Sequence, residues 1–317
     1  MNKLLITSEC HFGRLPDGAV YSITPGGDLG HWRRYLAVFA EVQVLGRLRD
    51  IPALPAGVLA ATGVSVVMRG LPDYTGPLAY VQHGRRIRRL CARYASEPGA
   101  AAILRAPGAI AATLRGSLQR VGKPYGVEVL GDPYEAFAPG AVVHPLRVVF
   151  RYWFTQQLLR MCREACAVAY VTRSALQRRY PPRAGAFVTD FSDVDLSPGA
   201  YVAQPRCAPC QERRKRLVTV GSLAQLYKGT DVLLEAVARC VGSGKDIELA
   251  IVGDGRYRSD LAARAAALGL GDRVVFTGRL PPGDAVRSEL DRADLFVLPS
   301  RSEGLPKALL EAMARGL

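Results

Sequence analysis

The stretch of sequence that decides the fold lies near the end of the chain and reads Leu295-Phe-Val-Leu-Pro-Ser-Arg-Ser-Glu-Gly-Leu-Pro-Lys-Ala-Leu-Leu-Glu-Ala-Met-Ala-Arg-Gly316. It opens on an apolar, β-prone run, Leu295–Leu298, and ends in a segment with the apolar spacing of a helix. Pro306 suits the first position of that helix, where a missing N–H costs little. The stretch therefore predicts a strand, a loop and a helix whose N-terminus favours an anion such as a diphosphate.

The second half of the chain repeats this alternation of short apolar runs and amphipathic segments, which is typical of βαβ units around a parallel sheet. Open sheets of this kind bind ligands beyond the carboxyl ends of their strands. The predicted strands are Leu217–Val220, Glu248–Val252, Val274–Thr277 and Leu295–Leu298, the predicted helices Thr230–Val241, Tyr257–Leu268, Asp284–Ala293 and Lys307–Arg315, and the loops expected at a ligand 221–229, 253–257, 277–283 and 299–306.

The first half shows the same alternation, and the pattern breaks over Pro181–Arg216, a stretch with prolines and a basic run that suits a hinge. The fold class predicted is α/β, with two Rossmann-like parallel-sheet domains. We expect these at residues 1–195 and 217–317, joined by a hinge at 196–216. The chain stops soon after its last predicted helix, so we expect the second domain to be C-terminally truncated. The first-half strands are predicted at Leu4–Thr7, Val42–Leu45, Val64–Met68, Ala101–Leu104, Val127–Leu130 and Val168–Val171.

Composition is that of a cytoplasmic globular protein. With 49% hydrophobic and 22% charged residues in 317, the chain can bury a core, and its length favours two domains. The apolar run at Leu4–Ile6 is too short for a signal peptide, and the uncharged stretch Ile51–Met68 is interrupted by prolines and glycines. Seven scattered cysteines indicate free thiols. Cys207-Ala-Pro-Cys210 lacks a second ligand pair at suitable spacing, so we expect no metal site.

A formal net charge of +14 is concentrated in Arg/Lys clusters at 85–93, 147–163, 173–183 and 206–216. A solvated basic surface, an anionic membrane and phosphorylated substrates all fit this charge, which alone does not choose among them. Nucleic acid is not expected, because the sequence has no zinc finger, RNP motif or heptad-linked basic region.

Two glutamates, Glu303 and Glu311, carry the most specific functional signal. Lys307 and Glu311 stand four residues apart and could be no more than a surface ion pair. Together with the preceding strand, the Ser-Glu-Gly-Leu-Pro loop and the Glu-Ala-Met-Ala-Arg-Gly helix end, however, the segment closely resembles the Glu-(seven residues)-Glu signature of the retaining family-4 glycosyltransferases. The resemblance implies a GT-B fold, a nucleotide diphosphate sugar as donor, a hydroxyl acceptor and no metal or other cofactor.

Further similarity to this family assigns the donor side. The segment from Leu217 to Ala236 resembles the family's first strand, loop and helix, where a basic pair binds the donor diphosphate; Lys228 matches one member, and Ser222 replaces the usual arginine. Neutralisation of the diphosphate would then rest on Lys228, the helix dipole and Arg301 or Lys307. The resemblance implies sugar contact by Glu303 and ribose contact by Glu311. The remaining donor-binding residues expected are Gly221, Gly253, Gly278, Leu280, Gly304, Leu305 and Pro306.

The first domain resembles the family more loosely and is expected to bind the acceptor. Gly27 and Gly30 belong to a loop leading into the first helix, and Arg105 follows a predicted strand. Asp132 stands at a strand end where many members carry a histidine. It could assist deprotonation of the acceptor as a catalytic residue beside Lys228 and Glu303, or simply form a turn, and the sequence leaves both open.

The function expected is a retaining glycosyltransferase that takes a UDP- or GDP-sugar, in bacterial polysaccharide or glycolipid assembly. The basic clusters make a lipid-linked acceptor at the inner face of the cell membrane attractive. Two alternatives stay open. Ser222 and the missing histidine favour a nucleotide-sugar-binding or inactive regulatory module; the two Rossmann-like halves would suit an NAD-dependent oxidoreductase, although the glycine fingerprint after Leu4–Thr7 is missing.

Overall fold

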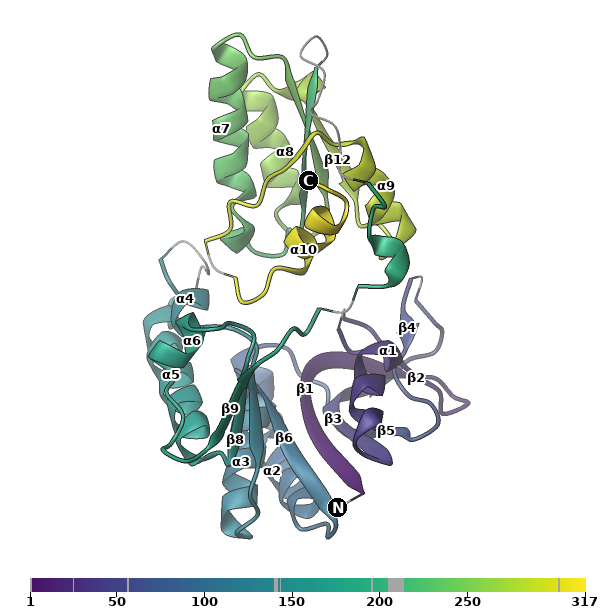
Figure 1. Ribbon diagram of the computed structural model, residues 1–317, viewed down its shortest axis with the longest axis vertical. Helices are drawn as coiled ribbons and strands as arrows, with labels where there is room; N and C mark the ends of the chain where they lie inside the picture. The colour runs from purple at the N-terminus through teal and green to yellow at the C-terminus, as the bar shows by residue number, and fades with distance from the viewer. Residues whose placement is uncertain are drawn as a thin grey trace. The chain divides into compact units, whose positions relative to one another are not determined.

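The computed structural model describes residues 2–24, 26–55, 57–139, 142, 144–194, 196–204, 214–301 and 303–317. The chain divides into two compact units (Figure 1). The first comprises Met1–Gly131 and Trp153–Asp193, and the second comprises Asp132–Tyr152 and Val194–Leu317. Each unit holds one sheet, in agreement with the predicted α/β fold class.

The first unit is built on a 9-stranded sheet in which β1 (Lys3–Arg14) occupies a central place. It pairs in parallel with β3 (Glu41–Asp50) on one side and β6 (Ala100–Ala106) on the other. The parallel sheet continues from β3 to β5 (Val66–Pro72), and from β6 through β7 (Gly126–Val129) and β8 (Ala167–Tyr170) to β9 (Phe187–Asp190). Two short antiparallel strands, β2 (Val20–Ser22) and β4 (Leu59–Ala60), extend the far end of β1.

Strand β1 changes its neighbour along its length. Lys3–Ile6 pairs with β6, whereas Phe12–Arg14 pairs with β2, and the register with β3 shifts between Thr7 and His11. Such an irregularity bends a strand and lets it leave one partner for another. The sequence predicted only Leu4–Thr7, because the polar residues Ser8, Glu9 and His11 interrupt the apolar pattern of this strand.

Helices cover the sheet where its side chains are apolar. Helix α2 (Gly76–Ala95) packs against β5 and against α3 (Ala109–Arg120), which lies on β1 and β6. The core between the short segment α1–η1 (Leu29–Arg33 and Arg34–Ala37) and the sheet includes the fully buried Trp32. Helix α6 (Ala175–Arg179) also belongs to the first unit, as does α5 (Arg147–Glu164) from Trp153 onward, whereas α4 (Pro133–Ala136) and the start of α5 belong to the second unit.

Three strands were missed by the sequence, and one predicted strand begins late. All residues of β9 are exposed, so this edge strand lacks the apolar alternation that signals a strand, and it falls within the proline-containing stretch assigned to a break. β2 and β4 hold only 3 and 2 residues. Strand β5 begins at Val66 instead of Val64, which is 94% exposed and precedes a left-handed residue, Ser65.

The second unit contains a 4-stranded parallel sheet in the order β12-β11-β10-β13. β10 (Lys215–Val220) is followed by α7 (Thr230–Gly242), β11 (Ile247–Val252), α8 (Arg258–Ala267), β12 (Val274–Gly278), α9 (Asp284–Arg292), β13 (Leu295–Phe296) and α10 (Lys307–Ala314). The chain therefore adds β11 and β12 on one side of β10 and β13 on the other. The boundary between β10 and β13 is where the strand order reverses.

Alternate residues of β11 build two cores, one on each face of this sheet. Leu249 and Ile251 pack beneath α7 and α8, whereas Ala250 and Val252 pack with residues of α9 and α10, among them Leu290 and Ala312. This two-sided burial explains why the strand reads as a continuous apolar run in the sequence. The helices and strands of this unit lie within two residues of those predicted, and η2 (Pro198–Ala200) is the helical segment described within the predicted hinge.

No helix in the described part of the chain combines the length and apolar character that crossing a bilayer requires.

Candidate functional site

The loops that follow β10 and β13 meet at the reversal of strand order. At the end of the first loop, Gly229 adopts a left-handed conformation with φ of +71°, and a Cβ there would lie 2.1 Å from the carbonyl oxygen of Pro299. The backbone N–H of Arg301 also donates to the carbonyl of Tyr227 at 2.7 Å. In open α/β sheets, this boundary is where ligands bind. The site is therefore built first by backbone contact between two loops.

Lys228 and Glu303 face each other across these loops. The Lys228 ammonium donates to Oε1 of Glu303 at 2.6 Å, and the side chains are 15% and 22% exposed. Lys228 is the last residue of η3 (Leu226–Lys228), and its Nζ lies 5.0 Å from the centre of the Tyr227 ring. The two side chains therefore hold each other in a defined position while remaining partly exposed to solvent. A ligand with phosphate and hydroxyl groups would find a cation and a carboxylate side by side.

Arg301 has a structural task in the same loop. Its guanidinium donates to both carboxylate oxygens of Asp231, in the first turn of α7, at 2.9 and 2.7 Å, and also to the carbonyl of Leu226. Burial raises the pKa of Asp231, but the hydrogen bond and charge of Arg301 outweigh it and hold that pKa below its usual value. Because its fork is occupied, Arg301 fixes the loop that carries Lys228 and is poorly placed to neutralise a diphosphate as well.

Glycines bring the loops after β10, β11 and β12 together. A Cβ on Gly253, whose φ is +151°, would lie 1.8 Å from the carbonyl oxygen of Gly221. The N–H of Gly253 in turn donates to the carbonyl of Gly278 at 2.9 Å, and the stem of Lys228 runs along Gly221. Three of the predicted donor-binding glycines therefore lie together. Gly255, which was not predicted as a site residue, is equally constrained, since its Cβ would lie 2.2 Å from the N atom of Ala224.

Ser222 keeps its hydroxyl within its own loop. Its Oγ accepts from the N–H of Ala224 at 3.2 Å, and the residue is exposed. A hydroxyl in this arrangement supplies no positive charge toward a ligand. Positive charge at this end of the sheet must come from other residues, as the sequence already indicated.

Helix α10 begins at Lys307, with Pro306 as the residue that precedes its first turn. Lys307 lies 3.7 Å from Glu311, so the surface ion pair considered for these two residues is present. Burial raises the pKa of Glu311, and the charge of Lys307 opposes that rise only in part. Gly304 and Leu305 are half-buried in the loop before this helix, and Leu280 packs against the core formed by α9 and α10.

The residues predicted for the acceptor side lie in or beside the first sheet. Gly27 packs against Ser22 and Phe12, since a Cβ there would come within 2.6 Å of the Ser22 hydroxyl, and its carbonyl accepts from the Trp32 indole. Gly30 lies in the first turn of α1, where a Cβ would be 3.0 Å from the capping carboxylate of Asp28. Close packing alone therefore explains why glycine stands at both positions, without contact to a ligand.

Asp132 caps a short helix. Its carboxylate accepts from the N–H of Tyr134 at 2.9 Å, at the N-terminus of α4. This geometry is that of a turn-forming aspartate, one of the two possibilities that the sequence left open. Its role in deprotonating an acceptor stays a prediction.

Arg105 lies in a buried network of charged groups that the sequence missed. Its guanidinium is 3.2 Å from the Glu128 carboxylate and 3.3 Å from that of Asp193, while the Tyr35 hydroxyl donates to both oxygens of Glu128 at 2.9 Å. Burial raises the pKa of Glu128 despite the nearby Arg105. Asp193 ends the first unit, so this network holds the segment from which the chain continues toward the hinge. No local sequence pattern links four residues from such distant parts of the chain.

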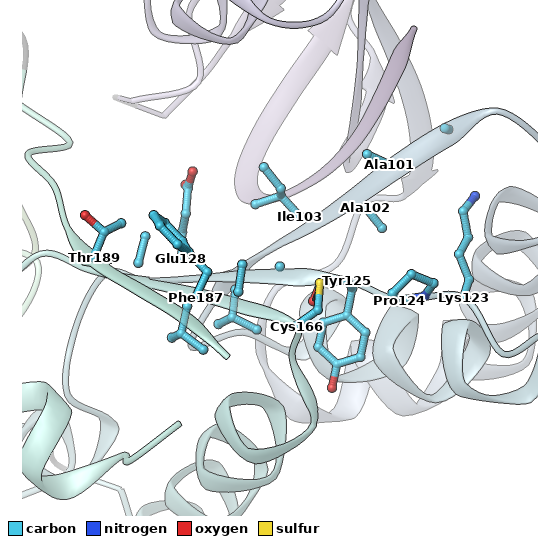
Figure 2. A pocket seen from close by; sticks show the side chains of 16 residues that line it. Ala101, Ala102, Ile103, Lys123, Pro124, Tyr125, Glu128, Cys166, Phe187 and Thr189 are labelled. Atoms are coloured by element: carbon cyan, nitrogen blue, oxygen red, sulfur yellow. Dashed lines mark hydrogen bonds between the residues drawn. The ribbon is translucent and has the colours of Figure 1, made fainter. Parts of the chain in front are cut away.

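A cavity of about 400 Å³ lies elsewhere, lined by residues of β6, β7, β8 and β9 and by residues that lead into β7 and β8 (Figure 2). Its walls are mainly apolar, and none of the predicted site residues lines it. Among the described residues, no group of three or more His, Cys, Asp or Glu side chains is arranged to hold a metal ion. Cys207 and Cys210, the one CxxC pair weighed as a metal site, fall outside the described residues.

The sequence and the fold of this chain are similar to those of known proteins. Residues 214–317 match the family model described as Glycosyl transferases group 1. The chain is 22% identical over 295 residues to Protein CapJ of Staphylococcus aureus, covering 90% of this chain and 70% of that protein. It is 30% identical over 207 residues to the 2-deoxystreptamine glucosyltransferase of Streptomyces kanamyceticus, covering 62% of this chain but only 52% of that protein, about half its length.

Among solved structures, the sucrose-phosphate synthase of Thermosynechococcus elongatus matches with a TM-score of 0.65 and 16% identity, over 100% of this chain and 80% of that one. At this identity the match speaks for the fold. The glycosyltransferase expected from the sequence is thus confirmed at the level of fold and domain. The chain has the GT-B fold, and its residues 214–317 are similar to the Glycosyl transferases group 1 domain.

Proposed function

We propose that this chain binds a nucleotide diphosphate sugar and transfers the sugar to a hydroxyl acceptor with retention of the anomeric configuration. The observation that carries the proposal is the 2.6 Å contact between Lys228 and Glu303 at the reversal of strand order. The two residues belong to the loops after β10 and β13, which the fold brings together from 75 positions apart. A donor of this class offers both a diphosphate and sugar hydroxyls to such a pair.

The chemical difficulty of the proposed reaction is departure of the nucleotide diphosphate from an oxocarbenium-like sugar. Positive charge fixed at the leaving oxygens stabilises this step most, because it needs no reorganisation as negative charge develops. Lys228 supplies that charge, and Glu303 and Tyr227 hold it in place before the donor arrives. The N-terminus of α10 adds a positive dipole end. Arg301 contributes by fixing the loop rather than by touching the diphosphate.

Glu303 and Glu311 take the hydroxyl groups of the donor in this proposal. A carboxylate accepts two hydrogen bonds from neighbouring hydroxyls, so Glu303 would orient the sugar and Glu311 the ribose. Gly221, Gly253 and Gly278 allow the close backbone approach that a nucleotide needs. Catalysis requires no resident metal in this scheme, since Lys228 provides the charge at the leaving group.

The setting that we propose is bacterial polysaccharide or glycolipid assembly, with a UDP- or GDP-sugar as donor. The net charge of +14 favours an acceptor that carries phosphate, such as a lipid-linked one at the inner face of the cell membrane. A cytoplasmic protein with peripheral attachment to that membrane would meet both substrates.

A second candidate is a nucleotide-sugar-binding module without turnover. The exposed Ser222 favours this candidate, because its hydroxyl stays within its own loop and supplies no charge. The diphosphate would then meet only one cation of the expected basic pair. An NAD-dependent oxidoreductase is a weaker alternative, since β1 is not followed by a glycine fingerprint.

Titration calorimetry with UDP, GDP and NAD, followed by a turnover assay with a panel of UDP- and GDP-sugars, distinguishes these functions. We expect one nucleoside diphosphate to bind and its sugar to be transferred. Lys228→Ala should lower turnover at least about a hundredfold, as loss of one transition-state contact does. Lys245→Ala, in an exposed lysine after α7, is the matched control and should act like the wild type. Binding without transfer would favour the module, and NAD binding would favour the oxidoreductase.

A further inference from the structure

Helix α2 presents a face of uncompensated positive charge. Its 20 residues include five arginines and no acidic residue. None of the five forms an ion pair with another residue in the described part of the chain, whereas the arginines of β1, β3, β6, β10 and α8 include several that do. All five side chains belong to exposed residues. The arginines are Arg85, Arg86, Arg88, Arg89 and Arg93.

These arginines lie on one side of the helix. At about 100° per residue, the exposed positions from Arg88 round to Arg86 cover about 160° of the helix surface. The opposite side carries the buried Ile87, Cys91 and Ala95, which pack on the rest of the unit. The exposed face of α2 is therefore a cationic surface held in place by a buried one, and not a flexible tail.

Two large aliphatic side chains belong to the same face. Leu78 is 81% exposed and Val81 is 73% exposed, at the N-terminal end of the helix. Leu78, Val81, Arg85 and Arg89 follow one another at spacings of three or four residues, which places them in one row along the helix. Exposed aliphatic side chains lower the solubility of a protein, and they would make no favourable contact with a polyphosphate ligand in water. In the interface of a bilayer, however, they enter the acyl boundary while the arginines meet anionic headgroups.

We propose that the exposed face of α2 docks this protein on an anionic membrane surface, with Leu78 and Val81 inserted and the five arginines at the headgroups. The proposal selects one of the charge clusters seen in the sequence. In the other cluster carried by a long helix, α5, Arg147 and Arg151 donate to the carbonyls of Phe137 and Tyr134 and are thus turned to the protein itself. Docking through α2 does not depend on the proposed sugar transfer.

Vesicle co-sedimentation of the full chain, without donor or acceptor, tests the proposal. Vesicles of phosphatidylcholine with about a third phosphatidylglycerol should bind the wild type, and pure phosphatidylcholine vesicles should not. Raising the salt should weaken binding. Each basic residue at such a surface is worth about a fivefold change in partitioning, so Arg85→Gln with Arg89→Gln should lower it by at least about tenfold.

The matched control removes the same charge from α5. Arg160→Gln with Arg163→Gln alters two exposed arginines in the same unit and should leave partitioning within about twofold of the wild type. An equal loss in both pairs would mean that net charge alone drives binding, and would overturn the proposal. So would absence of wild-type binding to the anionic vesicles.

A third variant separates a membrane from a nucleic acid. Leu78→Ser with Val81→Ser should lower partitioning to anionic vesicles, most clearly at high salt, where the apolar contribution remains. Both positions are exposed, so the fold should be kept, which circular dichroism checks. If this variant binds the vesicles like the wild type, while a short DNA duplex competes with them for the arginine face, that face serves nucleic acid and the proposal is wrong.

Discussion

Gly229 and Pro299 lie so close that a Cβ on Gly229 would be 2.1 Å from the carbonyl oxygen of Pro299. This contact joins the loop that ends in Lys228 to the loop that carries Glu303. Real Cβ atoms do not approach an oxygen so closely, and Gly229 also has a left-handed φ of +71°. The position therefore permits glycine alone, and the geometry of the Lys228–Glu303 pair depends on it.

Gly229→Ala should thus destabilise the second unit and displace Lys228. We expect the free energy of unfolding to fall by about 3 kcal/mol or more, because strain at positive φ and overpacking add. Gly244→Ala is the matched control: its φ is +84°, but no atom lies within 4 Å of the added Cβ, so only the strain of about 1–2 kcal/mol applies. Urea unfolding of both variants measures the difference. Equal losses in the two variants would show that the loops are not in contact as described.

The Arg301–Asp231 pair predicts a dependence of stability on acid pH. The pKa of Asp231 is lower in the folded chain than in the unfolded one, so its contribution is present above the unfolded value of about 3.9 and is lost as pH falls through the folded value. Its size should be about 1 kcal/mol, given the partial exposure of both side chains. Asp231→Asn should reduce stability at pH 7 and flatten this part of the profile. Urea midpoints between pH 7 and about pH 2 test it, and an unchanged acid slope in the variant would contradict the assignment.

Much of the second unit could be predicted from the sequence because its signals are local. The strands β10 and β11 supply apolar residues to the cores on both faces of the sheet, and the helices that follow them keep their apolar spacing. Lys228 and Glu303 could be named by resemblance, but their direct contact could not be predicted. That contact depends on β13 pairing with β10 rather than with β12, and no periodicity in the sequence encodes strand order.

Site residues were harder to predict in the first unit, because its buried polar residues pair with partners that are distant in the sequence. Arg105 was expected beside an acceptor, yet its guanidinium forms ion pairs with Glu128 and Asp193 in a buried network. A sequence shows a charged residue but not the partner that neutralises it. For the same reason, the sequence suggested Arg301 as a diphosphate ligand, although the structure shows that its guanidinium is paired with Asp231.

The raised pKa of Glu311 leads us to expect a pH dependence of ligand binding. Its folded pKa is raised by burial, so the carboxyl takes up a proton at a higher pH than an ordinary glutamate. Since only the ionised form accepts two ribose hydroxyl groups, affinity for the nucleoside diphosphate should rise as pH increases through this raised pKa. Glu311→Gln should bind more weakly and lose this dependence.

Lys307→Ala provides the second half of that test. Lys307 lowers the pKa of Glu311, so its removal should move the affinity profile to higher pH without abolishing it. Calorimetric titration with UDP and GDP from about pH 4, just below the ordinary glutamate pKa, to pH 8 measures both variants. A profile that is identical in the wild type and in Glu311→Gln would show that Glu311 does not contact the ligand.

Arg105→Ala should destabilise the first unit more than any exposed arginine does. The side chains of Arg105 and Glu128 are 8% and 11% exposed, so removal of the cation leaves the Glu128 carboxylate buried with its charge uncompensated, at a cost of about 3–5 kcal/mol. Adding Glu128→Gln should recover part of this lost free energy of unfolding, because a neutral amide can still accept from the Tyr35 hydroxyl.

Arg120→Ala, at the exposed end of α3, is the control and should change the free energy of unfolding by less than about 0.5 kcal/mol. Guanidinium unfolding of the single and double variants gives the coupling between Arg105 and Glu128. A coupling near zero would mean that the two charges do not stabilise each other in the folded chain, and that the segment ending in Asp193 is held by other contacts, such as those that Arg34 makes with the carbonyls of Ser192 and Asp193.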